Sequence, residues 1–272
     1  MTAQWERLFQ NEGIWQGSFT RLSPAGDVLE DIPSIVSLEA LNQGETMRQI
    51  VRKLPVNQDP EEQVYEYRSL GKGVLFFENG AFSQGSIQWG PFSEFGAELG
   101  LIWGDRRLRL VQIFGKDNQL AQLTLIREAR ANSNAPERPP LTVADLLGTW
   151  QGEAITLYPD LRPDDTYETR LIIEQSDRNQ LTQTLQMGKR PQIVQSTGCV
   201  QGSQIQFEPS TQVLCLPDGA TATGPTSIST NTPLFLEVGW LLEPGLRQRM
   251  IRYYDERGAW SSLTLVTERR DG

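Results

Sequence analysis

The sequence predicts an all-β protein made of two tandem antiparallel up-and-down β-barrels, each preceded by a short helix. Two observations lead to this fold class. Blocks of sequence recur in the same order at offsets of 135 to 140 residues, which indicates an internal duplication. Much of the remaining chain consists of short apolar segments bounded by glycine, asparagine or aspartate, a pattern typical of strands joined by turns.

The duplication divides the chain into two copies. The matching segments are 13–18 with 148–153, 74–81 with 213–220, 98–100 with 237–239, 107–111 with 247–251, and 123–128 with 263–268. A copy of this length can enclose its own core. We therefore expect a first barrel over residues 1–130, a linker over residues 131–140 and a second barrel over residues 141–272.

A short helix is predicted at the start of each copy, over residues 2–11 and 142–147. In the first copy, apolar residues recur at helical spacing. In the second, Thr142 is a suitable N-cap and Asp145 follows three residues later, a capping arrangement. The linker contains three prolines, which favour an extended backbone between the copies.

The rest of each copy is predicted to form eight to ten strands. Predicted strands include 45–54, 63–70, 74–77, 96–103 and 107–114 in the first copy, and 167–175, 181–187, 192–200, 234–242 and 248–254 in the second. A meander of this many strands would leave two unpaired edges unless it closed into a barrel. Residues 221–232, rich in threonine, serine, glycine and proline, are predicted to form a loop at the barrel mouth.

Composition excludes several partners. The net charge of −9 argues against nucleic acid and anionic membranes. No apolar run approaches the length of about 18 residues that a membrane-spanning helix needs. The chain has two cysteines, Cys199 and Cys215, and therefore no disulfide framework is expected. These features favour a cytoplasmic protein.

The chain contains no histidine, which excludes several kinds of site. Serine and cysteine triads, histidine-ligated metals and imidazole proton transfer all require this residue. Two cysteines cannot form a four-thiolate zinc site, and no glycine-rich phosphate loop is present. We therefore predict no metal site, and the sequence identifies no catalytic residue.

The first strand of each copy opens on a Gly-x-Trp motif, at residues 13–15 and 148–150. With the short helix before it and an arginine near the last strand, this motif resembles the calycin architecture of lipocalins and fatty-acid-binding proteins. In the lipocalin pattern the tryptophan closes the barrel base and the arginine lies over its ring in a cation–π contact. The resemblance therefore implies a structural plug made by Trp15 with Arg130 and by Trp150 with Arg270.

A second motif runs from Glu237 to Arg249 and continues at residues 267–270 (TERR). It resembles the S-type phycobiliprotein lyases of cyanobacteria, single calycin barrels that hold an open-chain tetrapyrrole and deliver it to a cysteine of an acceptor protein. The tandem arrangement is similar to an uncharacterised cyanobacterial family of paired calycin domains. Because the first copy has Leu101 where Trp240 stands, we expect the second barrel to be the better candidate for binding.

Residues two apart on a strand share a face, so Arg247, Arg249 and Tyr253 point the same way. Two arginines inside a barrel need carboxylate partners, either Glu268 or the propionates of a ligand. The resemblance implies ligand-binding roles for Trp240, Arg247, Arg249, Tyr253 and Glu268, and for Arg107, Arg109 and Glu128 in the first copy. The alternative is that these arginines face solvent or form structural ion pairs.

The expected function is binding of an apolar, carboxylate-bearing small molecule. The resemblance suggests a bilin as the cofactor or ligand and a phycobiliprotein as the partner, with a fatty acid or terpenoid as the second candidate. One alternative is an enzyme, a bilin lyase or a barrel-type isomerase or cyclase, that transfers protons through Glu268, a tyrosine or an aspartate. Another is a structural or interaction protein whose barrels are filled by side chains.

Overall fold

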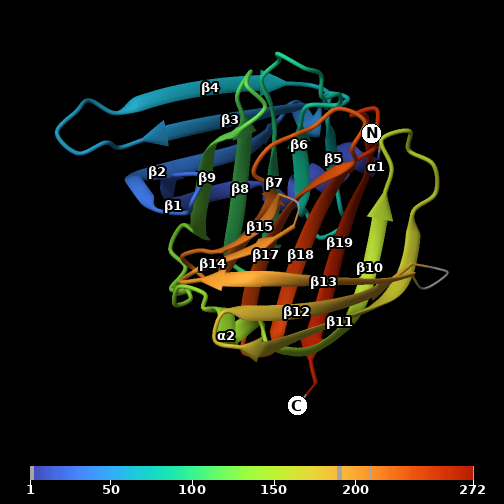
Figure 1. Ribbon diagram of the computed structural model, residues 1–272. Helices are drawn as coiled ribbons and strands as arrows, with labels where there is room; N and C mark the ends of the chain where they lie inside the picture. The colour runs from blue at the N-terminus through green and yellow to red at the C-terminus, as the bar shows by residue number, and fades with distance from the viewer. Residues whose placement is uncertain (1–2, 189–191, 209, 272) are drawn as a thin grey trace.

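The structure, a computed structural model, describes residues 3–188, 192–208 and 210–271. Over these residues the fold consists almost entirely of antiparallel strands, which confirms the predicted all-β class. Figure 1 shows the two units, the first in blue to green and the second in yellow to red. No helix in the described part of the chain is long and apolar enough to cross a membrane.

The first unit is a nine-stranded sheet with the order β4-β3-β2-β1-β9-β8-β7-β6-β5. Its strands are β1 (Gly13–Leu22), β2 (Val28–Leu41), β3 (Thr46–Lys53), β4 (Glu61–Tyr67), β5 (Val74–Phe76), β6 (Phe82–Gly85), β7 (Phe95–Trp103), β8 (Arg106–Phe114) and β9 (Leu120–Arg130). The helix α1 (Ala3–Leu8) and the 3-10 turn η1 (Phe9–Asn11) precede it, and η2 (Asn42–Gly44) joins β2 to β3. The predicted first helix thus breaks into two short pieces, and its first residue, Thr2, lies outside the described residues.

The second unit is a closed barrel of ten strands in sequence order. The strands are β10 (Gly148–Leu157), β11 (Asp165–Asp177), β12 (Gln180–Met187), β13 (Gln192–Gln201), β14 (Gln204–Phe207), β15 (Thr211–Cys215), β16 (Ala220–Pro225), β17 (Leu234–Glu243), β18 (Leu246–Tyr254) and β19 (Trp260–Arg270). Helix α2 (Val143–Leu146) precedes them, and the backbone N–H of Thr142 donates a hydrogen bond of 2.9 Å to Asp145. This contact is part of the predicted capping arrangement.

The first unit differs from the expected barrel because β4 and β5 are not hydrogen-bonded to each other. In the second unit the short strand β14 pairs with both β13 and β15 and closes the ring. The first unit has no counterpart of β14, so its sheet curls but stays open. Helix α1 covers the edge of β5 instead, since the Gln4 side chain accepts a hydrogen bond from Phe76 N at 2.7 Å and donates one to Phe76 O at 3.1 Å.

The prediction of a loop over residues 221–232 is wrong for residues 221–225. Residues 220–225 form β16, which pairs with β15 and β17 and is buried along its whole length. Small side chains are needed there because the neighbouring strand is close: a Cβ on Gly239 would lie 2.3 Å from the Thr221 hydroxyl. Threonine and alanine are therefore packing residues in this segment, not loop residues.

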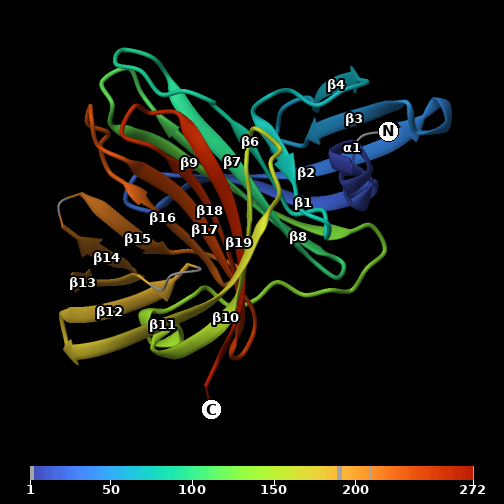
Figure 2. The same ribbon diagram turned by 90° about the vertical axis from the view of Figure 1, so that its right-hand side faces the viewer.

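The largest apolar cluster in the described chain lies between the two units. Strands β7 and β8 of the first unit lie alongside β17 and β18 of the second (Figures 1 and 2). Their outward faces supply the leucine pair Leu99 and Leu110 on one side and Leu236 and Met250 on the other, all without measurable exposure. The outer faces of these four strands therefore form one core that the two units share.

A buried arginine also joins the units. Arg252 of β18 donates hydrogen bonds to Gly73 O at 3.2 Å, Ser83 Oγ at 3.1 Å and Ser86 O at 3.0 Å, all in the first unit. Its guanidinium carbon lies 3.5 Å from the centre of the Trp260 ring. Because Arg252 has no exposed surface, these neutral acceptors and the indole replace the water that the charge loses on burial.

The shared core predicts the behaviour of Leu99→Ala. Removing this buried side chain should lower the free energy of unfolding by about 2–5 kcal/mol. The two units should still unfold in one calorimetric transition, because the cluster spans both. Val64→Ala is the control, since Val64 is 54% exposed on β4 and should change stability by less than about 0.5 kcal/mol. Two separate transitions would contradict the shared core.

Candidate functional site

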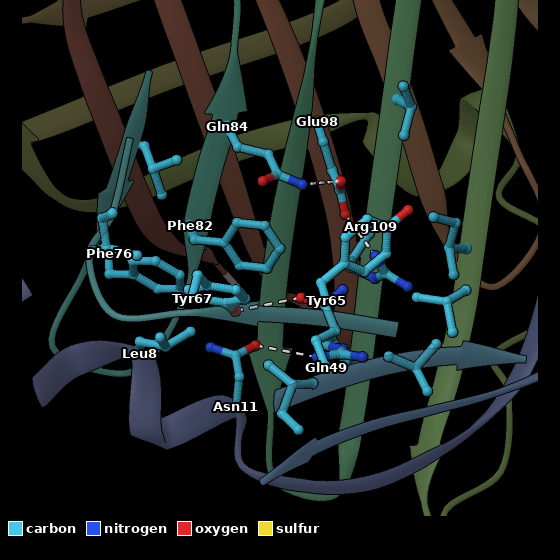
Figure 3. A pocket seen from close by; sticks show the side chains of 18 of the residues that line it. Leu8, Asn11, Gln49, Tyr65, Tyr67, Phe76, Phe82, Gln84, Glu98 and Arg109 are labelled. Atoms are coloured by element: carbon cyan, nitrogen blue, oxygen red, sulfur yellow. Dashed lines mark hydrogen bonds and ion pairs between the residues drawn. The ribbon is translucent and has the colours of Figure 1, made fainter. Parts of the chain in front are cut away.

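A cavity of 590 Å³ lies within the curl of the first unit. Figure 3 shows Phe76 and Phe82 together on one wall, with Leu8 and Asn11 from the N-terminal segment at one end. Glu98 and Arg109 point toward one another from β7 and β8. We call this space the first-unit cavity. Its size falls in the range of about 300–1,000 Å³ that is usual for small-molecule pockets.

Strand alternation explains which side chains line the cavity. On β3, Gln49, Val51 and Lys53 point inward, and Ile50 and Arg52 point outward. The same rule directs the odd-numbered residues of β8 inward, while its even-numbered leucines enter the core between the units. The lining therefore combines aromatic and aliphatic side chains with a few polar groups, which is the composition of many ligand sites.

A buried ion cluster forms one wall of this cavity. Arg107 Nε lies 2.7 Å from Glu128 Oε2, and Arg109 Nε lies 3.0 Å from the same oxygen. Arg109 Nη1 lies 2.6 Å from Glu98 Oε1. Two guanidinium groups and two carboxylates balance in charge, and Glu128 is 1% exposed.

The second barrel contains the equivalent cluster. Arg247 Nε lies 2.5 Å and Arg249 Nε 2.8 Å from Glu268 Oε1, and Arg249 Nη1 lies 3.1 Å from Glu237 Oε2. These four residues occupy the positions of the first cluster in the repeat. Both pairs of arginines point inward and are buried, which excludes the solvent-facing alternative. Their charges are met by the protein's own carboxylates.

The ion clusters hold their carboxylates ionised. Burial alone would raise the pKa of Glu128, but the charges of Arg107 and Arg109 outweigh it and lower that pKa to about 2. Burial and the charges of Arg247 and Arg249 have the same net effect on Glu268, whose pKa is also about 2. Glu268 is therefore unprotonated at neutral pH and cannot act as a general acid.

The tryptophan of each Gly-x-Trp motif lies under two arginines. The Trp15 ring centre is 4.1 Å from the guanidinium carbon of Arg130 and 4.5 Å from that of Arg107. In the second barrel, Trp150 lies 4.1 Å from Arg247 and 5.5 Å from Arg270. Neither indole has measurable exposure. In each unit the indole therefore packs against a guanidinium group of the ion cluster, that of Arg107 or Arg247, and against the arginine at the end of the last strand.

The structure separates Trp240 from the other predicted ligand-binding residues. Trp240 is three positions from the inward-facing Glu237, and an odd separation places it on the opposite face of β17. It lies in the core between the units, 3% exposed, and its indole N–H donates a hydrogen bond to Asp218 O at 3.0 Å. It therefore does not stack on a ligand inside the second barrel.

Tyr253 shares the inward face of β18 with the arginines but lies toward the far end of the strand, 39% exposed. The interior of the second barrel near Trp150 is occupied by an apolar cluster that includes Leu171, Ile173, Leu181 and Phe207. The first-unit cavity therefore offers the better-defined binding space, whereas the sequence favoured the second barrel. Within the described residues, no group of three or more acidic or cysteine side chains is arranged to hold a metal ion.

Sequence reasoning missed Lys53. Its ammonium lies 5.1 Å from the centre of the Phe19 ring, at the cavity wall. Among the cavity-lining cations of the described chain, it is the one for which no ion pair is present; Arg107 and Arg109 are both paired. The alternation of Gln49, Val51 and Lys53 on one predicted strand was the available signal.

The fold and these sites define a duplicated all-β protein, with a curled open sheet that encloses a small-molecule-sized cavity and a closed ten-stranded barrel. Residues 1–133 match the N-terminal domain of the DUF3598 family, a domain of unknown function. The whole chain is 48% identical to a DUF3598 protein of unknown function from Nostoc punctiforme PCC 73102, with a TM-score of 0.93 and 100% of both chains covered. The chain therefore belongs to the DUF3598 family.

Two further similarities concern parts of the chain. Residues 137–271 match the C-terminal domain of a family described as biogenesis factor required for ATP synthase 1. The S-type phycobiliprotein lyase CPES from Guillardia theta is 12% identical, with a TM-score of 0.39 over 47% of this chain and 90% of the lyase. A search of the curated proteins found no match.

The ion clusters predict how stability depends on pH. Because the folded protein lowers the pKa of Glu128 from 4.5 to about 2, the stability from this group is complete above about pH 4.5 and is lost as the pH falls toward 2. Glu128→Gln should cost about 3–5 kcal/mol at pH 7, since it leaves buried arginines unpaired. The loss of folding free energy caused by Glu128→Gln should become smaller as the pH falls.

Chemical denaturation of the wild type and of Glu128→Gln between pH 7 and pH 3 tests this dependence. Glu268→Gln is the matched variant in the second barrel, whose carboxylate is held at the same pKa of about 2. A cost that stays constant over this pH range would show that Glu128 stabilises the fold by packing and not by charge.

Proposed function

We propose that this protein binds an apolar, carboxylate-bearing small molecule in the first-unit cavity. One observation carries the proposal: a cavity of 590 Å³ with apolar and aromatic walls contains Lys53, a cation without an ion pair among the described residues. A carboxylate beside Lys53 would satisfy this charge, while the rest of the ligand covers the apolar wall.

In this proposal Arg107 and Arg109 do not bind the carboxylate of the ligand, which is the role that the resemblance implied. All three guanidinium nitrogens of Arg109 bind Glu98 or Glu128, so a propionate at Arg109 would have to displace one of these carboxylates and leave it buried without its partner. The charge of Arg107 is met by the same Glu128. The ion cluster therefore serves as a rigid polar wall. Arg109 and Glu98 can still orient a neutral polar group of the ligand, since both line the cavity.

A bilin is the first candidate ligand, and a fatty acid or terpenoid the second. The paired rings of Phe76 and Phe82, whose centres are 5.2 Å apart, and the tyrosines of β4 offer flat surfaces for a conjugated molecule. If the ligand is a bilin, a phycobiliprotein is the natural recipient. Absorption spectra and mass analysis of protein purified from a pigment-producing host test this choice directly.

A second candidate function is assistance in the assembly of a multisubunit enzyme. The match of residues 137–271 to the domain of an ATP synthase biogenesis factor favours it, together with the apolar cluster inside the second barrel. A filled barrel acts through its outer surface and not through a pocket. Direct binding of purified ATP synthase subunits, unaffected by changes in the first-unit cavity, would support this function over the first.

Filling the cavity tests the proposed site. In Val51→Trp a large ring enters the cavity from β3, and affinity for biliverdin or hexadecanoate should fall by about tenfold or more, because the ligand loses its apolar contacts. Titration calorimetry measures the change. Ile50→Trp is the matched control, since Ile50 is the neighbouring residue on the outward face. Equal affinity in both variants would refute binding in this cavity.

The charge of Lys53 has a separate test. Lys53→Gln should weaken binding of hexadecanoate by about tenfold through the loss of a charge-assisted hydrogen bond. Binding of hexadecanol, which has the same chain without the charge, should not change. Arg52→Gln controls for net charge, because Arg52 faces outward and pairs with Glu62 at 2.5 Å. A similar loss for the acid and the alcohol would exclude a direct role for the ammonium.

A further inference from the structure

Strand β4 ends the sheet of the first unit, and the edge that it turns away from β3 has no neighbouring strand. All of its residues except Tyr67 are exposed. Its pairing with β3 is regular from end to end, and the strand contains no proline. Figures 1 and 2 show β4 at the outer margin of the first unit. The strand therefore lacks two features that commonly block an edge, a bulge and a proline.

The backbone of this edge is available for hydrogen bonding. The Leu54 N–H donates to Pro33 O at 2.8 Å, which makes these two residues a hydrogen-bonded pair of the ladder between β2 and β3. Such pairs alternate along an antiparallel ladder, so the register turns the N–H and C=O groups of Glu62, Val64 and Glu66 toward the free edge of β4. Within the described chain, no turn or loop hydrogen-bonds to these backbone groups.

The second unit has a strand at the equivalent edge. β4 and β13 are the fourth strands of their units, and β14 pairs antiparallel with β13, from Gly198 with Phe207 to Gln201 with Gln204. The first unit has no such strand before β5. Its other edge, on β5, is occupied by the Gln4 side chain. The edge of β4 is therefore the position at which one further strand would extend the first sheet toward the ten strands of the second unit.

The outward face of this edge carries a row of alternating charges. Glu39 of β2, Arg48 of β3 and Glu66 of β4 are aligned across the three strands. Arg48 Nη1 lies 4.0 Å from Glu39 Oε2, and Arg48 Nε lies 2.8 Å from Glu66 Oε1. The row contains two carboxylates and one guanidinium group, and it ends on a carboxylate at the free edge. A cation on an added strand would continue the alternation.

A second glutamate lies on the same face of the edge. Arg52 Nη2 of β3 lies 2.5 Å from Glu62 Oε2. The side chains of Glu62 and Glu66 remain 40% and 50% exposed, and Val64 between them is 54% exposed. Each glutamate has its arginine on the β3 side, so its other side can receive a cation from an added strand.

These glutamates make a second copy of the chain an unsuitable occupant of the edge. If two β4 strands paired antiparallel about Val64, Glu62 of one copy would lie opposite Glu66 of the other. Like charges directly opposite one another destabilise a strand pair. A segment with cations at both positions and an apolar residue opposite Val64 is complementary to the edge.

We propose that β4 binds an extended segment of a partner protein by strand addition. The segment runs antiparallel to β4, as β14 does to β13, and hydrogen-bonds to the backbone of Glu62, Val64 and Glu66. It carries lysine or arginine opposite the two glutamates and an apolar residue opposite Val64. The inference concerns a protein partner and does not depend on what the first-unit cavity binds.

A nuclear magnetic resonance titration of the isotope-labelled full chain with a synthetic peptide tests strand addition. The peptide has blocked ends and the sequence threonine, lysine, tyrosine, valine, threonine, lysine, tyrosine, which places its lysines opposite Glu62 and Glu66 and its valine opposite Val64. The backbone amide signals of these three residues should shift on binding, because their N–H groups face the added strand.

Methylated peptides show whether backbone hydrogen bonds hold the segment. N-methylation of the valine removes an N–H that faces β4 and should weaken binding about tenfold or more. N-methylation of the second threonine is the matched control, because its N–H faces away from β4, and it should leave the affinity unchanged. Equal affinities of the two methylated peptides, or shifts that leave the amides of Glu62, Val64 and Glu66 in place, would exclude strand addition here.

The charge of the edge has its own test. In Glu62→Gln/Glu66→Gln the peptide lysines lose their carboxylates and approach the arginines of β3, so affinity should fall about tenfold. Glu153→Gln/Glu168→Gln is the control, because it removes two exposed glutamates that lie opposite one another on β10 and β11. It should bind as the wild type does.

Replacing both peptide lysines with glutamate should reduce affinity for the wild type by a similar factor. Equal binding of the lysine and glutamate peptides would contradict a basic partner segment. Without peptide, the amide shifts of Glu62, Val64 and Glu66 should not depend on protein concentration. If they did, a second copy of the chain would be the occupant of the edge, and the inference would be wrong.

Discussion

The buried ion cluster of each copy is the constraint on which the rest of the structure depends. Glu128 and Glu268 each bind two arginines from the neighbouring strand, so β8 with β9, and β18 with β19, are held in one register with these residues inside. If β8 shifted by one residue relative to β9, Arg107 and Arg109 would face outward and the leucines of β8 inward. The same shift of β18 would turn Arg247 and Arg249 outward. The tryptophan beside each cluster packs against one of its arginines, Trp15 against Arg107 and Trp150 against Arg247. The duplication preserved this arrangement while the surrounding residues changed.

The alternation of inward and outward side chains along each strand also determines how the two units associate. With these ion clusters inside, most of the alternate residues of β7, β8, β17 and β18 are apolar and face outward, with Arg252 among the exceptions. An exposed apolar surface of that kind is unfavourable in water, and each unit covers the other's. Trp240 belongs to this surface. The two halves are therefore not independent barrels on a linker but two sheets that share their largest core, fastened by Arg252.

The sequence predicted what depends on local pattern. The repeat, the short helices, the Thr142–Asp145 cap and the common face of Arg247 and Arg249 all follow from residue spacing. It could not predict the open first sheet: the repeat offset rises from 135 to 139 before residue 213, but four extra residues in the second copy do not show that they form the strand β14 that closes the ring. Trp240 was misplaced because motif resemblance outweighed its odd distance from Glu237. Lys53 was missed because a cavity depends on contacts among distant strands.

The Gln4 side chain protects the edge of strand β5. Its carboxamide presents to Phe76 the same donor and acceptor that a neighbouring peptide group would present, so a single side chain occupies the site of an absent strand. If the amino-terminal helix detached, the backbone N–H and C=O of Phe76 on this edge would be exposed. An unpaired strand edge can pair with other extended chains, so the attachment of this helix keeps the β5 edge of the sheet from such pairing.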